Sequence, residues 1–192
     1  MKIAISPGNT KTGRIPALSL PPVVTCIPNA PCAKDCYALK AWKQYPATRA
    51  AWGRNLELWA KSPNEFTRQV SSYIAKRKPK FFRWHVSGDC PDQYYAEIVV
   101  EIAKAYPETK FLIFTKRYSW FTGKMPANLS VVFSCWPGLA LPRSRKIPRA
   151  FMQDGTETRV KGNELDCPGN CETCGMCWNL SQTGKNVVFE KH

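Results

Sequence analysis

Apolar residues recur along this chain with two different periods. Runs that are apolar on both faces and rich in aromatic or branched residues occur at 81–86, 111–115 and 129–134. Such runs predict buried strands. Between them, over 92–106, apolar residues return every three or four positions, which predicts an amphipathic helix. Strands of this kind separated by such helices are typical of a parallel sheet with helices packed against it.

Local signals mark where the helices begin. Ser62 stands before a proline and three residues before Glu65, the arrangement of an N-cap with Pro in the first turn. Pro91 and Asp92 open a second helix in a similar way. The pattern also predicts a helix from Ala47, a short extended segment over 15–25 and a last strand over 186–190.

The pattern changes after Gly138. Residues 139–166 are rich in Arg, Pro, Gly and Asp and have little periodicity, which predicts an irregular arm. We therefore expect one α/β domain over 1–192, with 139–192 as an irregular arm that carries the last cysteine group back to the body.

Each of the three predicted strands ends in a polar or glycine-containing cluster. The clusters are Ser87-Gly88-Asp89-Cys90, Thr115-Lys116-Arg117 and Cys135-Trp136-Pro137-Gly138. Ligands of parallel α/β folds lie at the carboxyl ends of the strands, so we expect the three clusters to meet at one rim. Chains also turn at strand ends without any ligand, but this explains one such cluster better than three. His85 lies inside a strand, where a hydrogen-bonded core residue is favoured over a proton carrier.

The strongest chemical signal is the cysteines. Of nine, seven form two groups, which in a reducing compartment indicates metal binding rather than disulfides. Cys167, Cys171, Cys174 and Cys177 have intervals of three, two and two residues, comparable to ferredoxin-type runs. Structural zinc sites usually use two CxxC pairs separated by a longer loop, so zinc stays the less favoured alternative to a 4Fe–4S cluster.

The second group is Cys26, Cys32 and Cys36, with intervals of five and three residues. Three thiolates hold a cluster that leaves one iron open, or borrow a ligand from elsewhere; the other alternative is that they pack as small buried residues. We expect one or two clusters in the chain. The isolated Cys90 and Cys135 are predicted to be buried core residues.

Composition limits the expected cellular location and the expected binding partners. No apolar run is long enough to span a bilayer, and residues 1–13 lack the apolar core of a signal peptide, so we expect a cytoplasmic protein without membrane contact. Lys and Arg number 28 against 14 Asp and Glu, a net charge of +14. This predicts an anionic partner, either nucleic acid or an acidic redox protein, although a merely solvated basic surface explains the charge equally well.

Several long segments together resemble the phage family called gene product 88. They are NTKTGRIPALSLPP, CIPNAPCAKDCYALK, FFRWHVSGD, FLIFTKRY, WPG and CPGNCETCGMCWNL. The resemblance covers most of the chain. It implies a phage-encoded protein of presumed iron–sulfur type, acting in the host cytoplasm, without an assigned reaction.

The order of motifs is also similar to radical S-adenosylmethionine enzymes, in which a three-cysteine loop follows the first barrel strand and a glycine-acid motif follows the second. This resemblance implies a partial parallel (β/α) barrel-like sheet, in a reduced form because fewer than six strands are evident. It implies cluster ligation by the Cys26–Cys36 loop. It also implies S-adenosylmethionine contacts from Asp89 with Ser87 and Gly88 toward the amino group, and from Lys116 toward the carboxylate.

Three functions follow from these patterns. The favoured one is an iron–sulfur protein for redox or electron transfer. The alternatives are a radical S-adenosylmethionine-type enzyme, which would use the rim residues, and a zinc-stabilised nucleic-acid-binding protein, which would use the basic charge.

Overall fold

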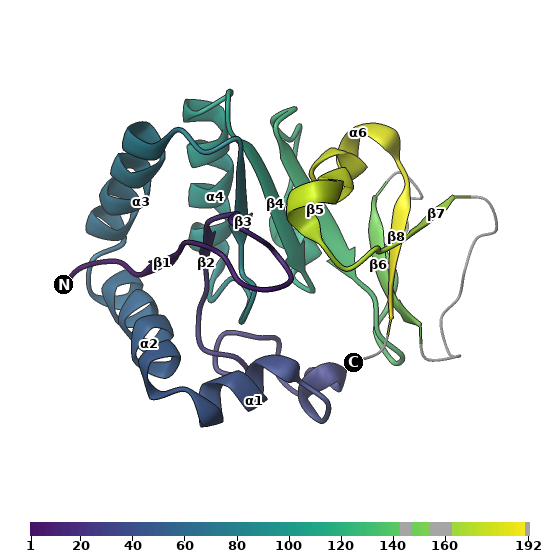
Figure 1. Cartoon of the computed structure of the whole chain (residues 1–192), viewed down its shortest axis with the longest axis horizontal. Coiled ribbons are helices and arrows are strands. Elements are labelled where there is room, and N and C mark those ends of the chain that lie inside the picture. Colours follow the sequence, from purple (N-terminus) through teal and green to yellow (C-terminus); the bar gives the residue numbers. More distant parts are fainter. Residues whose placement is uncertain (143–146, 154–162, 191–192) are drawn as a thin grey trace.

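One open, eight-stranded sheet organises the molecule (Figure 1). The computed structural model describes residues 1–142, 147–153 and 163–190. The strand order is β1-β2-β3-β4-β5-β6-β8-β7, and every neighbouring pair is parallel except β1 and β2. The strands are β1 (Ile5–Ser6), β2 (Ala17–Leu18), β3 (Phe81–Trp84), β4 (Lys110–Thr115), β5 (Leu129–Ser134), β6 (Arg149–Gln153), β7 (Glu164–Asp166) and β8 (Asn186–Glu190).

The predicted mixed α/β architecture with a mostly parallel sheet is confirmed, but the expectation of fewer than six strands was wrong. Strands β2, β3, β4, β5, β6 and β8 lie next to one another in parallel, in the order of the chain. The sheet does not close, because its edge strands β1 and β7 pair with one neighbour each.

The prediction of an irregular arm over 139–166 was also wrong in part, since β6 and β7 lie within it. Residues 143–146 and 154–162 of that arm lie outside the described residues. Both strands are too short to produce a recognisable period in the sequence. They form because β5 and β8 offer unpaired backbone groups on either side of β6, and β8 offers its second edge to β7.

Four long helices follow the first strands, and their starts agree with the sequence signals. The Ser62 hydroxyl accepts a hydrogen bond from the Glu65 amide (3.4 Å), and the Asp92 carboxylate accepts one from the Tyr95 amide (2.8 Å). None of the helices in the described part is long and apolar enough to cross a membrane. The helices are α1 (Tyr37–Gln44), α2 (Pro46–Lys61), α3 (Pro63–Arg77) and α4 (Gln93–Ala105).

The sheet separates two cores of different character. On one face Phe82 and Trp84 of β3 pack with residues of α2, α3 and α4. On the other face Phe81 packs in a core that contains Leu112, Val132, Trp178 and Leu180. The second face is covered by the C-terminal elements α5 (Cys171–Cys174), η3 (Met176–Asn179) and α6 (Leu180–Thr183), which lie at the end of the sheet away from α2 and α3 (Figure 1). Alternating strand residues therefore serve a helix-packed face and a cysteine-bearing face.

Candidate functional site

The C-terminal cysteines surround one small cavity. Cys167 follows β7, Cys171 and Cys174 begin and end α5, and Cys177 lies in η3. All four line a cavity of about 20 Å³ that is closed on the sheet side by Arg83, Leu112 and Phe114. The grouping of these four cysteines around a common centre, predicted from their short intervals, therefore holds in three dimensions.

Hydrogen bonds to distant parts of the chain, together with a local cap, fix this segment in place. The Asn170 side chain accepts from the Thr173 amide (3.2 Å) and caps α5, and the Cys171 amide donates to the Lys11 carbonyl (3.0 Å). Gly175 ends α5 with φ +62°, where a Cβ would lie 3.3 Å from the Phe81 ring. The buried Trp178 indole donates to the Phe82 carbonyl (3.1 Å). The cysteines are thus held by a backbone that is itself anchored to β3.

Two thiols of this group, those of Cys171 and Cys177, are in a desolvated environment. Burial raises the pKa of Cys177 to about 12, and the neighbouring thiols Cys167 and Cys171 add to the rise, whereas the Arg83 guanidinium opposes it. Burial likewise raises the pKa of Cys171, again against the effect of Arg83. Thiols of this kind stay protonated at neutral pH unless a cation takes the proton's place.

Arg83 is the one charged residue of β3, and its side chain faces the cysteines. Its guanidinium lies over the Phe114 ring (5.1 Å), and its Nε is buried without a hydrogen-bond partner among the described residues. Burial of the Tyr37 hydroxyl raises the pKa of this residue, which borders the other cysteine group, and the charge of Arg83 opposes the rise. Sequence reasoning missed Arg83, although a charged residue inside the apolar run FFRWHV was a signal available to it.

The N-terminal cysteines lie on the loop that follows β2. Cys26 precedes a turn, Cys32 lies in η1 (Pro31–Ala33), and Cys36 immediately precedes α1. All three are partly exposed. Burial raises the pKa of Cys26 to about 11; the Asp89 carboxylate and Cys32 add to the rise, while Lys116 opposes it. The loop thus brings three thiols to the carboxyl end of the sheet, beside residues that follow β3 and β4.

The turn at Ser87-Gly88-Asp89 holds the base of this loop through hydrogen bonds and close packing. Leu20 and Ser87 exchange two hydrogen bonds, one between backbones (3.0 Å) and one from the Ser87 hydroxyl (3.0 Å). The Asp89 amide donates to the Thr25 hydroxyl (3.1 Å). Gly88 has φ +79°, and a Cβ there would lie 2.5 Å from the Thr25 hydroxyl oxygen and 2.8 Å from the Leu20 carbonyl oxygen. Position 88 therefore requires glycine for both conformation and space.

The three strand-end clusters meet, as their positions predicted. The buried Asp89 carboxylate accepts hydrogen bonds from the Thr115 hydroxyl (2.7 Å), the Lys116 amide (2.9 Å) and the Cys90 amide (2.8 Å). Burial raises the pKa of Asp89, and these hydrogen bonds oppose the rise. The Lys116 ammonium donates to the Ser134 hydroxyl (3.1 Å) and lies 5.9 Å from the Trp136 ring centre. Residues following β3, β4 and β5 thus form one network beside Cys26.

His85 and the two isolated cysteines are core residues, as predicted. His85 is buried, its Nε2 lies 3.1 Å from the Tyr95 hydroxyl, and burial lowers its pKa to about 3. Its φ of +57° is uncommon for a residue with a side chain. Cys90 and Cys135 are 0% and 5% exposed.

The distances between ligand atoms distinguish a site for a single metal ion from a site for a larger metal cluster. In the part of the chain that the structure describes, the only three candidate ligand atoms within 4.8 Å of one another belong to His85, Asp89 and Cys90. No three of the seven grouped sulfurs approach that closely. Four sulfurs on one zinc ion would lie about 3.8 Å apart, as follows from tetrahedral Zn–S bonds of about 2.3 Å.

The molecule is therefore a mixed α/β protein with a parallel sheet and two separate cysteine groups on it. The sequence profile of the family described as gene product 88 matches residues 3–137, and the chain belongs to this family. The matched segment includes the Cys26–Cys36 loop, the Ser87–Asp89 turn and Lys116, and it ends before Cys167. No curated protein and no solved structure is significantly similar to the chain.

Proposed function

We propose that this protein binds iron–sulfur clusters and transfers electrons. The observation that carries the proposal is the convergence of Cys167, Cys171, Cys174 and Cys177 on one cavity against the sheet. Four thiolates wrapped within eleven residues are a ligand set for a 4Fe–4S cluster. Such a cluster supplies one-electron reduction and oxidation when bound.

The spacing of the sulfurs supports a cluster over zinc. A single zinc ion requires its four sulfurs within about 3.8 Å of one another, whereas each thiolate of a cubane binds a different iron and lies farther from the others. No three of the four C-terminal sulfurs lie within 4.8 Å of one another, so they are spaced more widely than a zinc ion requires. Iron is therefore favoured at this site.

The surroundings of the cavity suit a redox centre. Phe114 and Trp178 supply apolar walls, which limit water and lower the local dielectric. Arg83 supplies a positive charge beside the thiolates, and an anionic cluster would be the counter-ion that this guanidinium needs. We expect Arg83 to favour the reduced, more negative state of the centre.

The N-terminal group would hold a second cluster through Cys26, Cys32 and Cys36. Their position at the end of the sheet leaves them partly exposed, which suits electron exchange with another molecule. The basic charge of the chain would steer an acidic redox partner toward it in the host cytoplasm.

A radical S-adenosylmethionine-type enzyme is the second candidate, favoured by one specific observation. The three-cysteine loop follows the first of six parallel strands in chain order, and the Ser87–Asp89 turn and Lys116 follow the next two. Three thiolates leave one iron of a cubane free for an outside ligand. In this candidate Asp89, with Ser87 and Gly88, would face the amino group and Lys116 the carboxylate. Asp89 and Ser87 already hydrogen-bond within the fold, so they would have to share or exchange these partners.

Anaerobic purification followed by metal and sulfide analysis tests the proposal. We expect iron and sulfide in equal amounts, at four or eight per chain, little zinc, and an electron paramagnetic resonance signal of a reduced cluster. Zinc at one per chain without sulfide would contradict it.

Adding S-adenosylmethionine to the reduced protein separates the two candidates. Electron transfer predicts an unchanged spectrum and no 5′-deoxyadenosine. A changed spectrum together with 5′-deoxyadenosine would establish the second candidate instead.

A further inference from the structure

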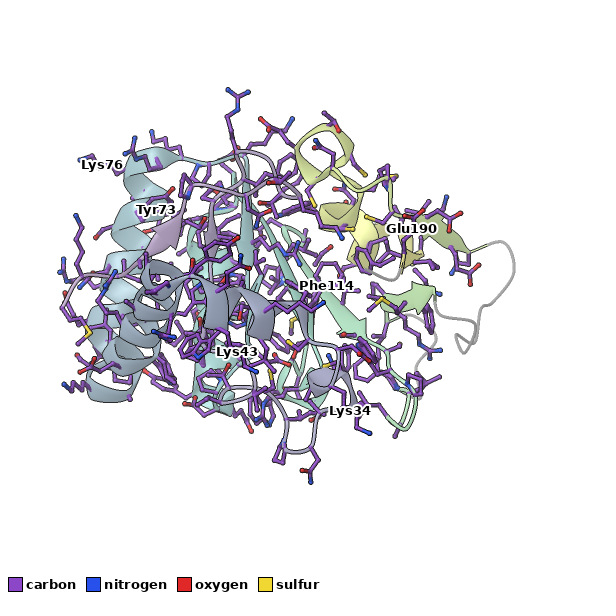
Figure 2. All side chains as sticks on the ribbon, turned by 60° about the horizontal axis from the view of Figure 1, so that its bottom comes forward. Lys34, Lys43, Tyr73, Lys76, Phe114 and Glu190 are labelled. Atoms are coloured by element: carbon purple, nitrogen blue, oxygen red, sulfur yellow. The ribbon has the colours of Figure 1, made fainter. Side chains whose placement is uncertain are left out.

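A second concave surface lies at the opposite edge of the sheet from the C-terminal cysteines. It is a groove of about 440 Å³ between the N-terminal segment and α3, beside the edge strand β1. Tyr73 and Lys76 mark it in Figure 2, on the far side of the molecule from Glu190 of β8. We call this surface the α3 groove; its lining includes Lys2, Ile5, Arg68, Tyr73, Lys76 and Arg77.

The helix itself aligns the cations of the α3 groove. Positions 68, 72 and 76 lie on one row of the helix surface, and 69, 73 and 77 lie on the next. Arg68 and Lys76 are therefore about 12 Å apart along the helix axis, and Tyr73 lies on the adjacent row. The result is a line of positive charge with an aromatic group beside it.

The charge of the groove is not compensated by its own lining. Among the residues that the structure describes, none that lines the groove is acidic. Arg68 pairs with Glu65 (2.6 Å), but Lys2, Lys76 and Arg77 have no ion pair within the described residues. Clustered like charges repel one another, so the arrangement is stabilised when an anion binds.

The two walls of the groove are tied together. The Ile3 amide donates to the Gln69 side chain (2.7 Å), and the same side chain donates to the Met1 carbonyl (2.9 Å). These bonds hold the N-terminal segment along α3 and keep Lys2 on the opposite wall from Lys76 and Arg77. The groove is thus a formed surface with cations on both sides.

We infer that the α3 groove binds the backbone of single-stranded nucleic acid. Cations on two walls match a chain of phosphates, and the partly buried Tyr73 on the α3 wall offers a stacking surface for a base. A single strand fits better than a duplex because its bases are free to reach Tyr73. This inference is independent of the proposed electron transfer, since the groove lies away from both cysteine groups.

Fluorescence anisotropy with a labelled oligonucleotide of about 16 nucleotides tests the inference. With three or four cations engaged, we expect the logarithm of affinity to fall with the logarithm of salt at a slope of about −2 to −3. The variant Lys76→Glu/Arg77→Glu should lower the slope by about 1.4 and weaken binding at least about tenfold at low salt. The conservative variant Lys76→Arg/Arg77→Lys should bind like the wild type.

A second double variant controls for net charge alone. Lys124→Glu/Lys185→Glu removes the same charge from two exposed loop positions outside the groove, and it should keep wild-type affinity and slope. Circular dichroism would verify that every variant is folded, and iron content should be equal in all of them.

Several outcomes would overturn the inference. These are no saturable binding by the wild type, equal weakening by both charge-reversal variants, or tighter binding of duplex than of single strand. Groove-dependent binding of polyglutamate without binding of oligonucleotides would assign the surface to an acidic protein instead.

Discussion

The two cysteine groups occupy different kinds of site on the same sheet. The C-terminal group has four partly exposed thiols around one cavity. It is anchored to β3 through Trp178, and three of its cysteines pack against a core. The N-terminal group also has partly exposed thiols, three of them, on a loop. The turn at Gly88 packs against the base of that loop. The difference teaches that one group is held by packing against the face of the sheet, whereas the other is held by the turn at the base of its loop.

The largest effect on iron content and thermal stability should follow from removing one thiol of the C-terminal group. Cys171→Ala should lose most of one cluster and lower the thermal midpoint by roughly 10 °C, because metal binding there is coupled to packing on the sheet. Iron analysis and thermal unfolding measure both effects. Cys135→Ala removes a buried cysteine outside both groups and should retain all the iron; equal iron loss in the two variants would contradict the assignment.

Gly88→Ala should disrupt the close packing between the turn at Gly88 and the base of the N-terminal loop. The added Cβ meets the Thr25 hydroxyl and the Leu20 carbonyl, and the positive φ adds strain, so we expect about 1–3 kcal/mol of destabilisation with loss of the N-terminal cluster only. Gly123→Ala is the matched control, since Gly123 has the same φ of +79° and open space around its Cβ position. Urea unfolding and iron content would expose the difference, and similar losses in both variants would refute the close-contact explanation.

Cys32→Ala should show whether the two cysteine groups bind separate clusters. We expect loss of about half the iron of a two-cluster protein, with a smaller change in the thermal midpoint than for Cys171→Ala, because Cys171 packs against a core cluster and Cys32 does not. Spectra of the reduced protein should then contain the C-terminal signal alone. Loss of all the iron would mean that the groups share one cluster.

Arg83→Gln should shift the C-terminal centre with little change in stability. Removing a positive charge beside the thiolates should make its reduction potential more negative, and Arg83→Lys should restore most of the difference. A redox titration followed by electron paramagnetic resonance measures the shift. An unchanged potential would show that Arg83 has only a packing role on Phe114.

The smallest effect concerns pH and the core behind the N-terminal loop. Because the pKa of His85 falls from 6.5 to about 3 in the fold, the unfolded chain takes up a proton first as pH drops. The contribution of His85 to stability is therefore present above pH 6.5 and is lost as pH falls from 6.5 toward 3. Arg83 assists this effect, and nearby Asp89, whose pKa is raised, opposes it at the acidic end.

His85→Asn isolates this contribution, since asparagine tolerates a positive φ. The free energy of unfolding, measured in urea between pH 5 and 7, should depend less on pH in the variant. An equal slope in both proteins would show that other groups account for the pH dependence.

The sequence by itself determined the elements with strong local signals. The apolar runs at 111–115 and 129–134 became strands, and the caps at Ser62 and Asp92 began helices, because these signals act within a few residues. The short intervals between Cys167 and Cys177 determined that these four cysteines line one cavity. Strand order also determined that Asp89, Lys116 and Trp136 lie near one another, since parallel strands end at one rim.

The tertiary structure alone decided the remaining features. β6 and β7 form from hydrogen bonds that neighbouring strands donate and accept, and these bonds leave no trace in a three- to five-residue sequence. The place of the C-terminal cysteines depends on contacts between residues almost a hundred positions apart, such as Trp178 with Phe82. The same contacts place Arg83, which in the sequence is only a charged residue within an apolar strand, beside the C-terminal thiols. Local chemistry selects the elements, but only packing decides which faces and which charges come together.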